Sequence, residues 1–380
     1  MKKTTSALMG TVFLVILMAV FIANIIIPDK KNSDEENRVL QQLPSFSVSA
    51  YKEGRFESKI EDYASDQFIL RNGFIRLKTA ADTALGGLES NGVYRCRDSY
   101  LMEDITVPTK DVKESNTSAL TAFKEANPDL KMYFLLAPNA ANILSDKLPI
   151  AVSTANQNKY MDDFFETVES LGITPIDVRD TFKEAKKDTQ LYYRTDHHWT
   201  TDGAYLAFEQ VNSVMELGNK VTYTDYAVKN DFRGTLASKS GFVNGMDDAI
   251  KIYLPAEDSE GYENSVIYYS DTKEKTTQFY QVDSLDTKDA YTVFGGSNHP
   301  MYTVRTPLDT DRHLLLIKDS YANSMVPFLS QCFSEIVVVD PRYFYDNIQD
   351  IISSESVTDV LFLYNANTFF ADMSLEMMVE

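Results

Sequence analysis

Apolar positions along the chain alternate between short continuous runs and runs with helical spacing. Short continuous runs are typical of buried strands, and runs with helical spacing predict amphipathic helices. The expected strands are 130–137, 173–178, 313–317, 335–339 and 359–364, with a short hairpin at 92–102. The expected helices are 115–126, 156–171, 181–187, 203–217, 321–329 and 347–353. Strands and helices that alternate in this way predict an α/β domain with a doubly wound, mostly parallel sheet and helices on both faces.

Two segments depart from this alternation. Residues 46–84 carry apolar side chains at near-helical spacing that is broken around Asp66–Asn72, which predicts two amphipathic helices. Residues 218–309 are rich in Tyr, Thr, Asp and Gly and contain short β-like runs such as 265–269. We interpret 218–309 as a β-rich insertion that lies over the sheet and shapes a substrate groove.

The longest apolar run lies at the N-terminus. Lys2 and Lys3 precede residues 7–27, which carry no charge. As a helix this run would span about 30 Å, the thickness of the hydrocarbon core of a bilayer. The end of the run offers no small-x-small cleavage site, so we expect an uncleaved anchor rather than a signal peptide. The predicted organisation is a transmembrane signal anchor at 1–28, a polar tether at 29–45 and one α/β domain at 46–380.

Charge and cysteine content narrow the classes of function. The formal net charge of −20 argues against nucleic-acid binding, because a polyphosphate would be repelled. Cys96 and Cys332 lie far apart and match neither a metal spacing nor a disulfide framework, so two buried thiols are expected. Basic residues flank the apolar run in nearly equal number, so charge alone does not set the orientation across a membrane.

Groups able to perform acid–base chemistry are concentrated in the polar stretch 192–200. It holds two of the four histidines, His197 and His198, and the only tryptophan, all beside Asp196. Because Asp196 and His198 are two residues apart, their side chains point to the same side of an extended backbone. A carboxylate there can hold one ring nitrogen while the other faces a nucleophile. An ordinary polar loop before a helix would have a similar composition.

A second stretch, 314–324, places a serine where a buried strand ends and a helix begins. In a doubly wound sheet this junction lies at the carboxyl edge, where ligands bind. Unpaired backbone N–H groups at the start of a helix can stabilise a developing oxyanion. Asp319 or Ser320 could instead serve only as a helix cap. Together with Asp196 and His198, the position makes Ser320 a candidate nucleophile.

The motifs resemble a known group of bacterial proteins. Asp196-His197-His198-Trp199 resembles the signature of the DHHW family. More distantly, the same stretch followed by Asp319-Ser320 resembles the alginate O-acetyltransferase proteins AlgJ and AlgX of the SGNH-hydrolase-like superfamily, in which the Asp and His also precede the Ser. The similarity runs from about Glu36-Asn37-Arg38 to the C-terminus. It includes Asp66-Gln67-Phe68-x-x-Arg71 and Gly295-Gly296-Ser297-Asn298-His299-Pro300.

The resemblance implies an SGNH-hydrolase-like fold and a role for each member of a catalytic triad. Ser320 would be the nucleophile, His198 the general base and Asp196 the group that orients the base. His197 matches a position that varies among these relatives, so it receives no catalytic role.

Several other residues are expected to surround the reacting atoms. The oxyanion would be bound by the backbone N–H of the nucleophile and by a group from Gly295, Gly296 or Asn298, although a Gly-Gly-Ser-Asn stretch is also typical of a turn. Tyr321, next to the nucleophile, is expected at the substrate site. Trp199 could stack on a sugar face or be buried behind the catalytic loop.

A metal site is the competing interpretation of the same polar residues. Asp196, His197 and His198 would be joined as ligands by His299 or Asp319. Adjacent histidines on an extended strand point to opposite faces, which makes joint ligation awkward. We therefore expect no metal ion and no other cofactor.

The expected function is that of a membrane-anchored extracytoplasmic acyl-ester enzyme, an O-acetyltransferase that acts on a cell-envelope polysaccharide. The resemblance also implies a membrane partner, a multi-spanning acyltransferase that supplies the acyl group. Two alternatives stay open: a carbohydrate esterase of the same fold, and a non-catalytic envelope protein that binds glycans or serves as a scaffold. The chemical reactivity of Ser320 separates the enzymes from the binding protein.

Overall fold

A computed structural model describes residues 2–33, 38–52, 54–242, 245, 247–256, 262 and 264–379. The α-helices are α1 (Lys2–Ile26), α2 (Val48–Lys52), α3 (Arg55–Asp66), α4 (Arg71–Ala84), α5 (Lys110–Ala126), α6 (Ala140–Ile143), α7 (Gln157–Ser170), α8 (Arg179–Ala185), α9 (Thr201–Val214), α10 (Thr235–Ser240), α12 (Val326–Leu329), α13 (Ile348–Ser354), α14 (Ala366–Phe369) and α15 (Ser374–Val379). The strands are β1 (Asn32–Ser33), β2 (Arg38–Val39), β3 (Glu89–Ser90), β4 (Val93–Arg95), β5 (Leu101–Glu103), β6 (Lys131–Ala137), β7 (Thr174–Ile176), β8 (Tyr223–Phe232), β9 (Asp248–Pro255), β10 (Val266–Tyr269), β11 (Lys275–Thr276), β12 (Met301–Arg305), β13 (His313–Lys318), β14 (Glu335–Val339) and β15 (Asp359–Asn365). The 3-10 turns are η1 (Arg97–Ser99), η2 (Ser145–Lys147), η3 (Val282–Asp286), η4 (Ala290–Val293) and η5 (Ser320–Ser324).

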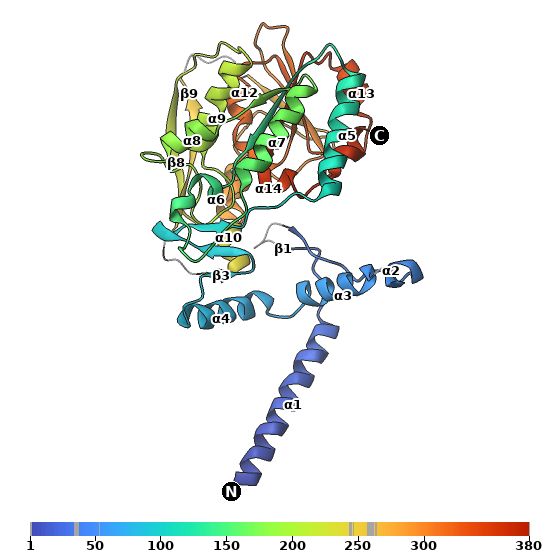
Figure 1. Cartoon of the computed structure of the whole chain (residues 1–380), viewed down its shortest axis with the longest axis vertical. Coiled ribbons are helices and arrows are strands. Elements are labelled where there is room, and N and C mark those ends of the chain that lie inside the picture. The colour runs from blue at the N-terminus through green and yellow to red at the C-terminus, as the bar shows by residue number, and fades with distance from the viewer. Residues whose placement is uncertain are drawn as a thin grey trace. The chain divides into compact units, whose positions relative to one another are not determined.

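An eight-stranded sheet with the order β11-β10-β12-β14-β13-β15-β6-β7 organises the α/β part of the chain. Figure 1 shows helices of this part, among them α5, α7, α9 and α13, around its strands. The strands from β14 to β7 pair in parallel. The remaining three strands extend the sheet in antiparallel fashion. The fold is therefore mixed α/β with a mostly parallel sheet, as the alternation of strands and helices predicts.

Side chains of β13 enter two different cores. Leu314 and Leu316 belong to one hydrophobic cluster, whereas Leu315 and Ile317 belong to the other. This separation follows because successive side chains of a strand point to opposite faces. Residues of α8 and α9 complete the first cluster, and residues of α5, α7 and α13 complete the second. Helices thus cover both faces of the sheet, and β13 is buried between them.

Two predicted elements differ from the observed ones because of proline. The helix expected at 321–329 is divided into η5 and α12, with Pro327 in the first turn of α12. Pro327 has no N–H to donate to the preceding turn, so an uninterrupted helix would be broken there. The strand expected at 173–178 shortens to β7, which contains Pro175 and lies at the edge of the sheet, where proline is tolerated.

The insertion predicted at 218–309 has two structural parts. β8 and β9 form a separate two-stranded antiparallel sheet. β10, β11 and β12 instead continue the main sheet at its antiparallel edge. The expectation that the whole segment lies over the sheet is therefore wrong. The backbone N–H and C=O groups along the outer edge of β14 would be unpaired without a neighbouring strand. β12 forms hydrogen bonds with them, which explains why these short strands join the sheet.

The two cysteines are not paired with each other. Cys96 is buried, as expected, whereas Cys332 is only half-buried, and both are free thiols. Burial raises the pKa of the Cys96 thiol to about 12, so it is an inert packing residue rather than a reactive thiolate.

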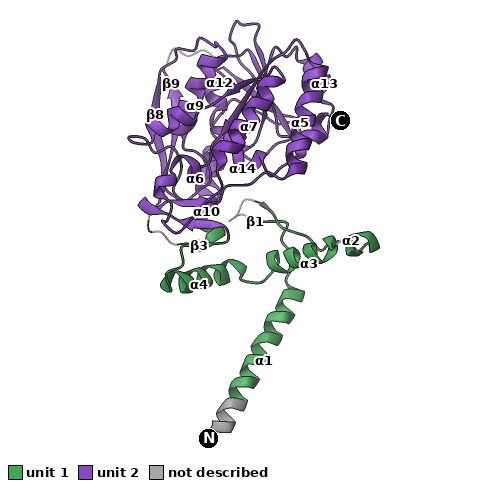
Figure 2. Ribbon diagram, viewed as in Figure 1, with its two compact units in different colours: residues 1–91, 237–243 green, residues 92–236, 244–380 purple. Residues whose placement is uncertain are grey.

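The chain divides into two compact units, residues 1–91 with 237–243 and residues 92–236 with 244–380 (Figure 2). In the first unit, Leu8–Ile26 of α1 has a mean hydropathy of 2.6 and is long and apolar enough to cross a membrane, a property that signal sequences share. α3 and α4 are the two helices expected in 46–84. Glu36 and Asn37, where the family resemblance begins, lie outside the described residues. The domain boundaries at residues 28 and 45 remain predictions.

Candidate active site

The Asp196–His198 segment lies in a bent loop between two buried aromatic residues. Tyr192 and Trp199 face each other in an antiparallel bridge, and the N–H of Thr200 donates to the carbonyl oxygen of Leu191 at 2.9 Å. These contacts close the base of the loop. The acid and imidazole groups are therefore presented from a rigid support instead of a flexible connection.

Trp199 attaches this loop to the turn that carries the candidate nucleophile. Its side chain is fully buried, and its Nε1–H lies 2.9 Å from the carbonyl oxygen of Tyr321 and 3.0 Å from Ser324 Oγ. Tyr321 and Ser324 both belong to η5. A buried indole offers no face to a sugar, so of the two alternatives for Trp199 the structure supports burial behind the catalytic loop.

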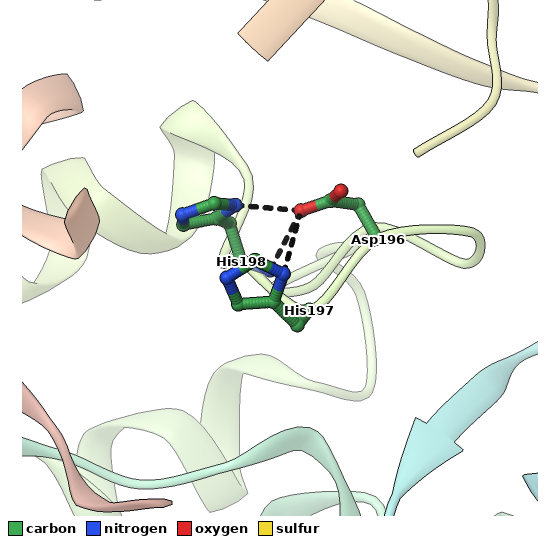
Figure 3. Close-up of side chains that lie close together, drawn as sticks. All are labelled: Asp196, His197 and His198. Carbon is green, nitrogen blue, oxygen red and sulfur yellow. Dashed lines mark hydrogen bonds and ion pairs between the residues drawn. The ribbon is translucent and has the colours of Figure 1, made fainter. Parts of the chain in front are cut away.

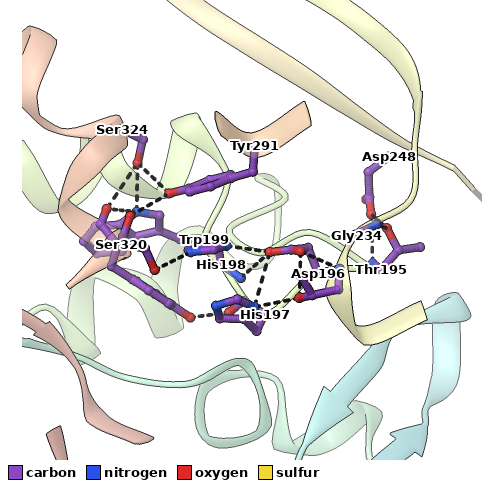
Figure 4. A network of polar contacts seen from close by, with 12 residues as sticks. Thr195, Asp196, His197, His198, Trp199, Gly234, Asp248, Tyr291, Ser320 and Ser324 are labelled. Carbon is purple, nitrogen blue, oxygen red and sulfur yellow. Dashed lines mark hydrogen bonds and ion pairs between the residues drawn. The ribbon is translucent and has the colours of Figure 1, made fainter. Parts of the chain in front are cut away.

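Ser320, His198 and Asp196 form a continuous chain of hydrogen bonds (Figure 4). His198 Nε2 lies 2.8 Å from Ser320 Oγ, and His198 Nδ1 lies 2.6 Å from Asp196 Oδ1. Because the carboxylate accepts, the assigned tautomer has the proton on Nδ1 and leaves Nε2 to accept from the serine hydroxyl. Asp196 is 2 % exposed and His198 is 3 % exposed, whereas Ser320 is half-buried. The serine is thus the most accessible of the three hydrogen-bonded residues.

The Asp196 carboxylate is held by residues that its own sequence motif does not contain. Its Oδ2 accepts from the backbone N–H of Thr235 at 2.8 Å and from Thr235 Oγ1 at 3.0 Å. A Cβ atom on Gly234 would lie 2.2 Å from Asp196 Oδ2, so only glycine allows this approach. The Gly234 N–H in turn donates to Thr195 Oγ1 at 3.1 Å, and Asp248 Oδ2 accepts from the Thr195 N–H at 2.8 Å.

Tyr291 covers the imidazole of His198. The two rings are stacked, with centroids 3.7 Å apart and planes 11° apart. Tyr291 is itself fixed, because its hydroxyl lies 3.3 Å from the carbonyl oxygen of Ser320 and 3.4 Å from Ser324 Oγ. This tyrosine comes from η4 in the inserted segment. No local pattern in the sequence distinguishes Tyr291, Gly234 or Thr235 as neighbours of the site.

Burial and charge set the protonation of the two central groups. Burial lowers the pKa of His198 to about 4, and the charge of His197 lowers it too, while Asp196 opposes both effects. Burial alone would raise the pKa of the Asp196 carboxyl, but the charges of His197 and His198 hold it well below its usual range. At neutral pH the site therefore contains an aspartate anion and a neutral imidazole, the states that a general base requires.

Asp319 rather than Ser320 caps η5. Its Oδ1 accepts from the N–H of Tyr321 at 2.9 Å, and its Oδ2 accepts from the N–H of Asn365 at 2.8 Å. These bonds tie the end of β13 to the end of the neighbouring β15. The Ser320 side chain is consequently free for His198, and its N–H has no acceptor among the described residues.

The other residues expected at the site lie elsewhere or serve differently. Tyr321 is fully buried and its hydroxyl donates to the carbonyl oxygen of His197, so its expected contact with substrate is wrong. Gly295 and Gly296 have φ of 82° and 79°, in keeping with the turn alternative. Among the described residues, no hydrogen bond joins either glycine or Asn298 to Ser320. Their role as oxyanion donors remains a prediction.

Asp196, His197 and His198 offer ligand atoms within 4.8 Å of one another (Figure 3). The expectation that adjacent histidines point to opposite faces is wrong here, because the loop is bent and the two ring centroids lie 3.9 Å apart. Both ring nitrogens of His198 are nevertheless hydrogen-bonded within the site. His299 and Asp319 do not belong to this cluster of ligand atoms. A metal ion would have to displace bonds that already satisfy the imidazole.

Residues 107–254 match a family model described as "SGNH hydrolase-like domain, acetyltransferase AlgX". Among solved structures, a DHHW family protein from Eubacterium siraeum has a TM-score of 0.62 and 24% identity, over 77% of this chain and 96% of that chain. PatB1 from Bacillus cereus, solved with a sulfonyl adduct, has a TM-score of 0.62 and 20% identity, over 74% of this chain and 97% of that chain. No match was found among curated proteins.

These likenesses confirm the resemblance that the Asp196-His197-His198-Trp199 motif indicates, and they show an SGNH-hydrolase-like fold. The matched region contains Asp196 and His198 but ends before Ser320. The assignment of Ser320 therefore depends on its contact with His198 and on its place at the end of β13.

Proposed function

We propose that this protein, which carries an SGNH-hydrolase-like domain, is a serine-dependent acyl-ester enzyme that acts on a cell-envelope polysaccharide. Ser320 is the nucleophile, His198 the general base and Asp196 the orienting carboxylate. The observation that carries the proposal is the hydrogen-bond chain of 2.8 Å and 2.6 Å through His198. The matched family model names an acetyltransferase, so acetyl is the expected acyl group.

The first half-reaction is acylation of the serine. Ser320 Oγ attacks the ester carbonyl while its proton passes to His198 Nε2. Asp196 stabilises the resulting imidazolium through the Nδ1–H bond. The carbonyl oxygen becomes an oxyanion, and the N–H of Ser320, which has no acceptor among the described residues, donates to it. The intermediate then expels the donor's oxygen, His198 returns the proton to it, and an acyl-serine remains.

The second half-reaction decides between transfer and hydrolysis. His198 Nε2 removes a proton from an incoming hydroxyl, which attacks the acyl carbonyl. The bond to Ser320 Oγ then breaks, and His198 returns the proton to the serine. A sugar hydroxyl gives an O-acylated polysaccharide, and water gives a carboxylic acid. Supplying the acyl-enzyme with an oligosaccharide acceptor and measuring acylated sugar against free acetate separates a transferase from a carbohydrate esterase.

A covalent label tests the nucleophile directly. After incubation with an organophosphonate or an aryl sulfonyl fluoride, mass spectrometry is expected to place the adduct on Ser320. His198→Ala should slow labelling strongly because the serine loses its base, whereas Ser353→Ala serves as a control at an exposed serine of α13. An unlabelled Ser320 in a folded protein would favour the glycan-binding protein without activity.

The location is part of the same proposal. The apolar helix α1 anchors the protein in the cell membrane as a single pass, and the α/β domain faces outward. A multi-spanning membrane acyltransferase would then deliver the acyl group across the bilayer. Protease treatment of intact cells is expected to remove the domain and leave a short membrane stub. Protection of the domain would place it in the cytoplasm and contradict an envelope substrate.

A further inference from the structure

A polar cavity lies outside the Ser320–His198–Asp196 group. Its volume is about 540 Å³, within the range of ligand sites. Its lining residues come from the end of β10, the strand β11, the turn η3 and the loop before β12, and it is open to solvent. Its lining includes Tyr269, Glu274, Lys275, Gln281, Ser297 and His299. None of the three proposed catalytic residues belongs to this lining.

The sheet places this cavity at the same edge as Ser320. Ser320 follows the carboxyl end of β13, and β14 runs parallel to β13. β12 is antiparallel to β14 and begins at this edge, where Met301 faces Val339. β10 is antiparallel to β12 and therefore ends at the same edge, where Tyr269 faces Tyr302. Neighbouring strands are about 4.8 Å apart, so three strand spacings put β10 about 14 Å from β13.

The polar groups in the cavity are held in fixed positions. His299 Nδ1 lies 2.9 Å and 3.0 Å from the two carboxylate oxygens of Asp271. The imidazole also stacks on Tyr269, with ring centroids 4.2 Å apart. Because Asp271 accepts from Nδ1, Nε2 is left as an acceptor. Ser297 Oγ is 3.4 Å from Nε2 and solvent-exposed, so a ligand hydroxyl can replace this long contact.

The charges in the lining select the type of ligand. Glu274 and Asp283 contribute two carboxylates, and Lys275 contributes one ammonium. An anionic polymer would be repelled, while the imidazole, hydroxyl and amide groups offer directional hydrogen bonds to neutral hydroxyls. The side-chain amide of Gln281 supplies a donor of this kind, and Nε2 of His299 supplies an acceptor.

We propose that this cavity is an acceptor subsite that binds a neutral, hydroxyl-rich sugar unit of a polysaccharide whose reacting unit lies at Ser320. The inference depends on the proposed function, because it assigns a binding site to a second sugar unit of the same polysaccharide substrate. It predicts that affinity depends on the length of the saccharide. A short saccharide reaches only Ser320, whereas a longer one reaches both positions.

Binding without turnover is the direct test. The full-length Ser320→Ala protein, in detergent, is titrated calorimetrically with oligomers of increasing length from cellulose, chitin and polygalacturonate. Affinity for the neutral cellulose or chitin oligomers should rise at the length that spans the two positions, and polygalacturonate should bind more weakly. Adding Ser297→Trp should fill the cavity and weaken binding of the long neutral oligomers about tenfold, equivalent to about 1.4 kcal/mol.

Two further variants keep the test decisive. Ser353→Trp is the matched control, because Ser353 is an exposed serine with one local hydrogen bond near the end of α13, at the opposite edge of the sheet. It should leave the length dependence intact. His299→Ala should reduce the length dependence without adding bulk. Equal affinity for short and long oligomers, or equal losses in Ser297→Trp and Ser353→Trp, would overturn the subsite.

The two proposals fail separately. Covalent labelling of wild-type Ser320 tests the enzyme and does not involve the cavity. Length-dependent binding with an unlabelled serine would reject the enzyme and keep a glycan-binding cavity. A labelled serine with length-independent binding would keep the enzyme and reject the subsite.

Discussion

Two groups made of a serine, a histidine and an aspartate lie at the same edge of the sheet, and they differ in geometry. We name Ser320, His198 and Asp196 the inner triad, and Ser297, His299 and Asp271 the outer group. The serine-to-histidine distance is 2.8 Å in the inner triad and 3.4 Å in the outer group. The aspartate side chain is 1% exposed in the inner triad and 36% exposed in the outer group. Residue types alone therefore do not identify a nucleophile.

The difference comes from what surrounds each carboxylate. Asp196 is enclosed by Thr235 and Gly234, and Tyr291 covers the imidazole that it orients. Burial excludes water from these bonds, so the geometry is fixed before substrate arrives. The Asp271 side chain in the outer group is 36% exposed, so water competes for the bonds that it accepts from His299. The inner triad is thus organised for proton transfer, and the outer group for contact with a ligand.

The largest expected effect comes from the inner serine and histidine. Ser320→Ala and His198→Ala should each lower kcat on a chromogenic acetyl ester by up to about a millionfold, since either loss leaves no activated nucleophile. Ser297→Ala and His299→Ala should act on KM for an oligosaccharide acceptor instead. Steady-state kinetics with both substrates measure the contrast. Comparable kcat losses in the two groups would mean that their roles are not distinct.

The next effect is that of the inner aspartate. Asp196→Asn keeps the shape but offers an amide to His198 Nδ1, which favours the wrong tautomer, so kcat should fall about 10⁴-fold. Asp271→Asn should have a far smaller effect on kcat, because His299 does not transfer a proton. The rate of labelling by an organophosphonate provides a second measurement. A mild Asp196→Asn defect would show that the imidazole needs no orienting anion.

A smaller loss is expected from the glycine that packs on the inner carboxylate. In Gly234→Ala the new Cβ would lie 2.2 Å from Asp196 Oδ2, so Asp196 or the connection between β8 and α10 must shift. A displacement near 1 Å at a catalytic group costs about a hundredfold in kcat. Gly73→Ala is the control, because its Cβ would meet nothing within 4 Å. Full activity in a folded Gly234→Ala protein would contradict a tightly fitted carboxylate.

The sequence predicts the inner triad but not its surroundings, for a physical reason. The strand pattern before Ser320 and the motif at Asp196 and His198 each lie within a short segment, so each can be recognised locally. The two segments meet because ligand sites of a parallel sheet lie at the carboxyl ends of its strands. Thr235 and Tyr291 reach the site only because the start of α10 and η4 fold back onto it, and no local pattern encodes such contacts. The bend at His197 likewise depends on the closure of its loop by buried neighbours.

The dependence of activity on pH tests the burial of His198 in the inner triad, and the expected effect is smaller. His198 has its pKa lowered to about 4 by burial and by the charge of His197, so it stays neutral, and able to accept a proton, above that pH. The kcat/KM for acylation should therefore fall only as the pH drops through about 4, whereas an unperturbed imidazole titrates near about 6.5.

His197→Ala sharpens this pH test. It removes one of the causes that lower the pKa of His198, so the acid limb should move to higher pH while activity at neutral pH changes little. Profiles of kcat/KM against pH for both proteins measure the shift. An acid limb that does not move would show that the charge of His197 does not influence the base. A severe defect of His197→Ala at neutral pH, with a mild one of His198→Ala, would identify His197 as the base.

The smallest expected effect is that of removing metal ions, and it concerns only the inner triad. His198 Nδ1 donates to Asp196 and Nε2 accepts from Ser320, so the imidazole has no lone pair for a cation while the triad is intact. Activity on the chromogenic ester should therefore survive extensive chelation. Added zinc should inhibit, because it would compete for the Nε2 lone pair that the serine proton needs. Activity that disappears with the chelator and returns with zinc would instead make Asp196, His197 and His198 metal ligands, and the inner triad would no longer be the source of the nucleophile.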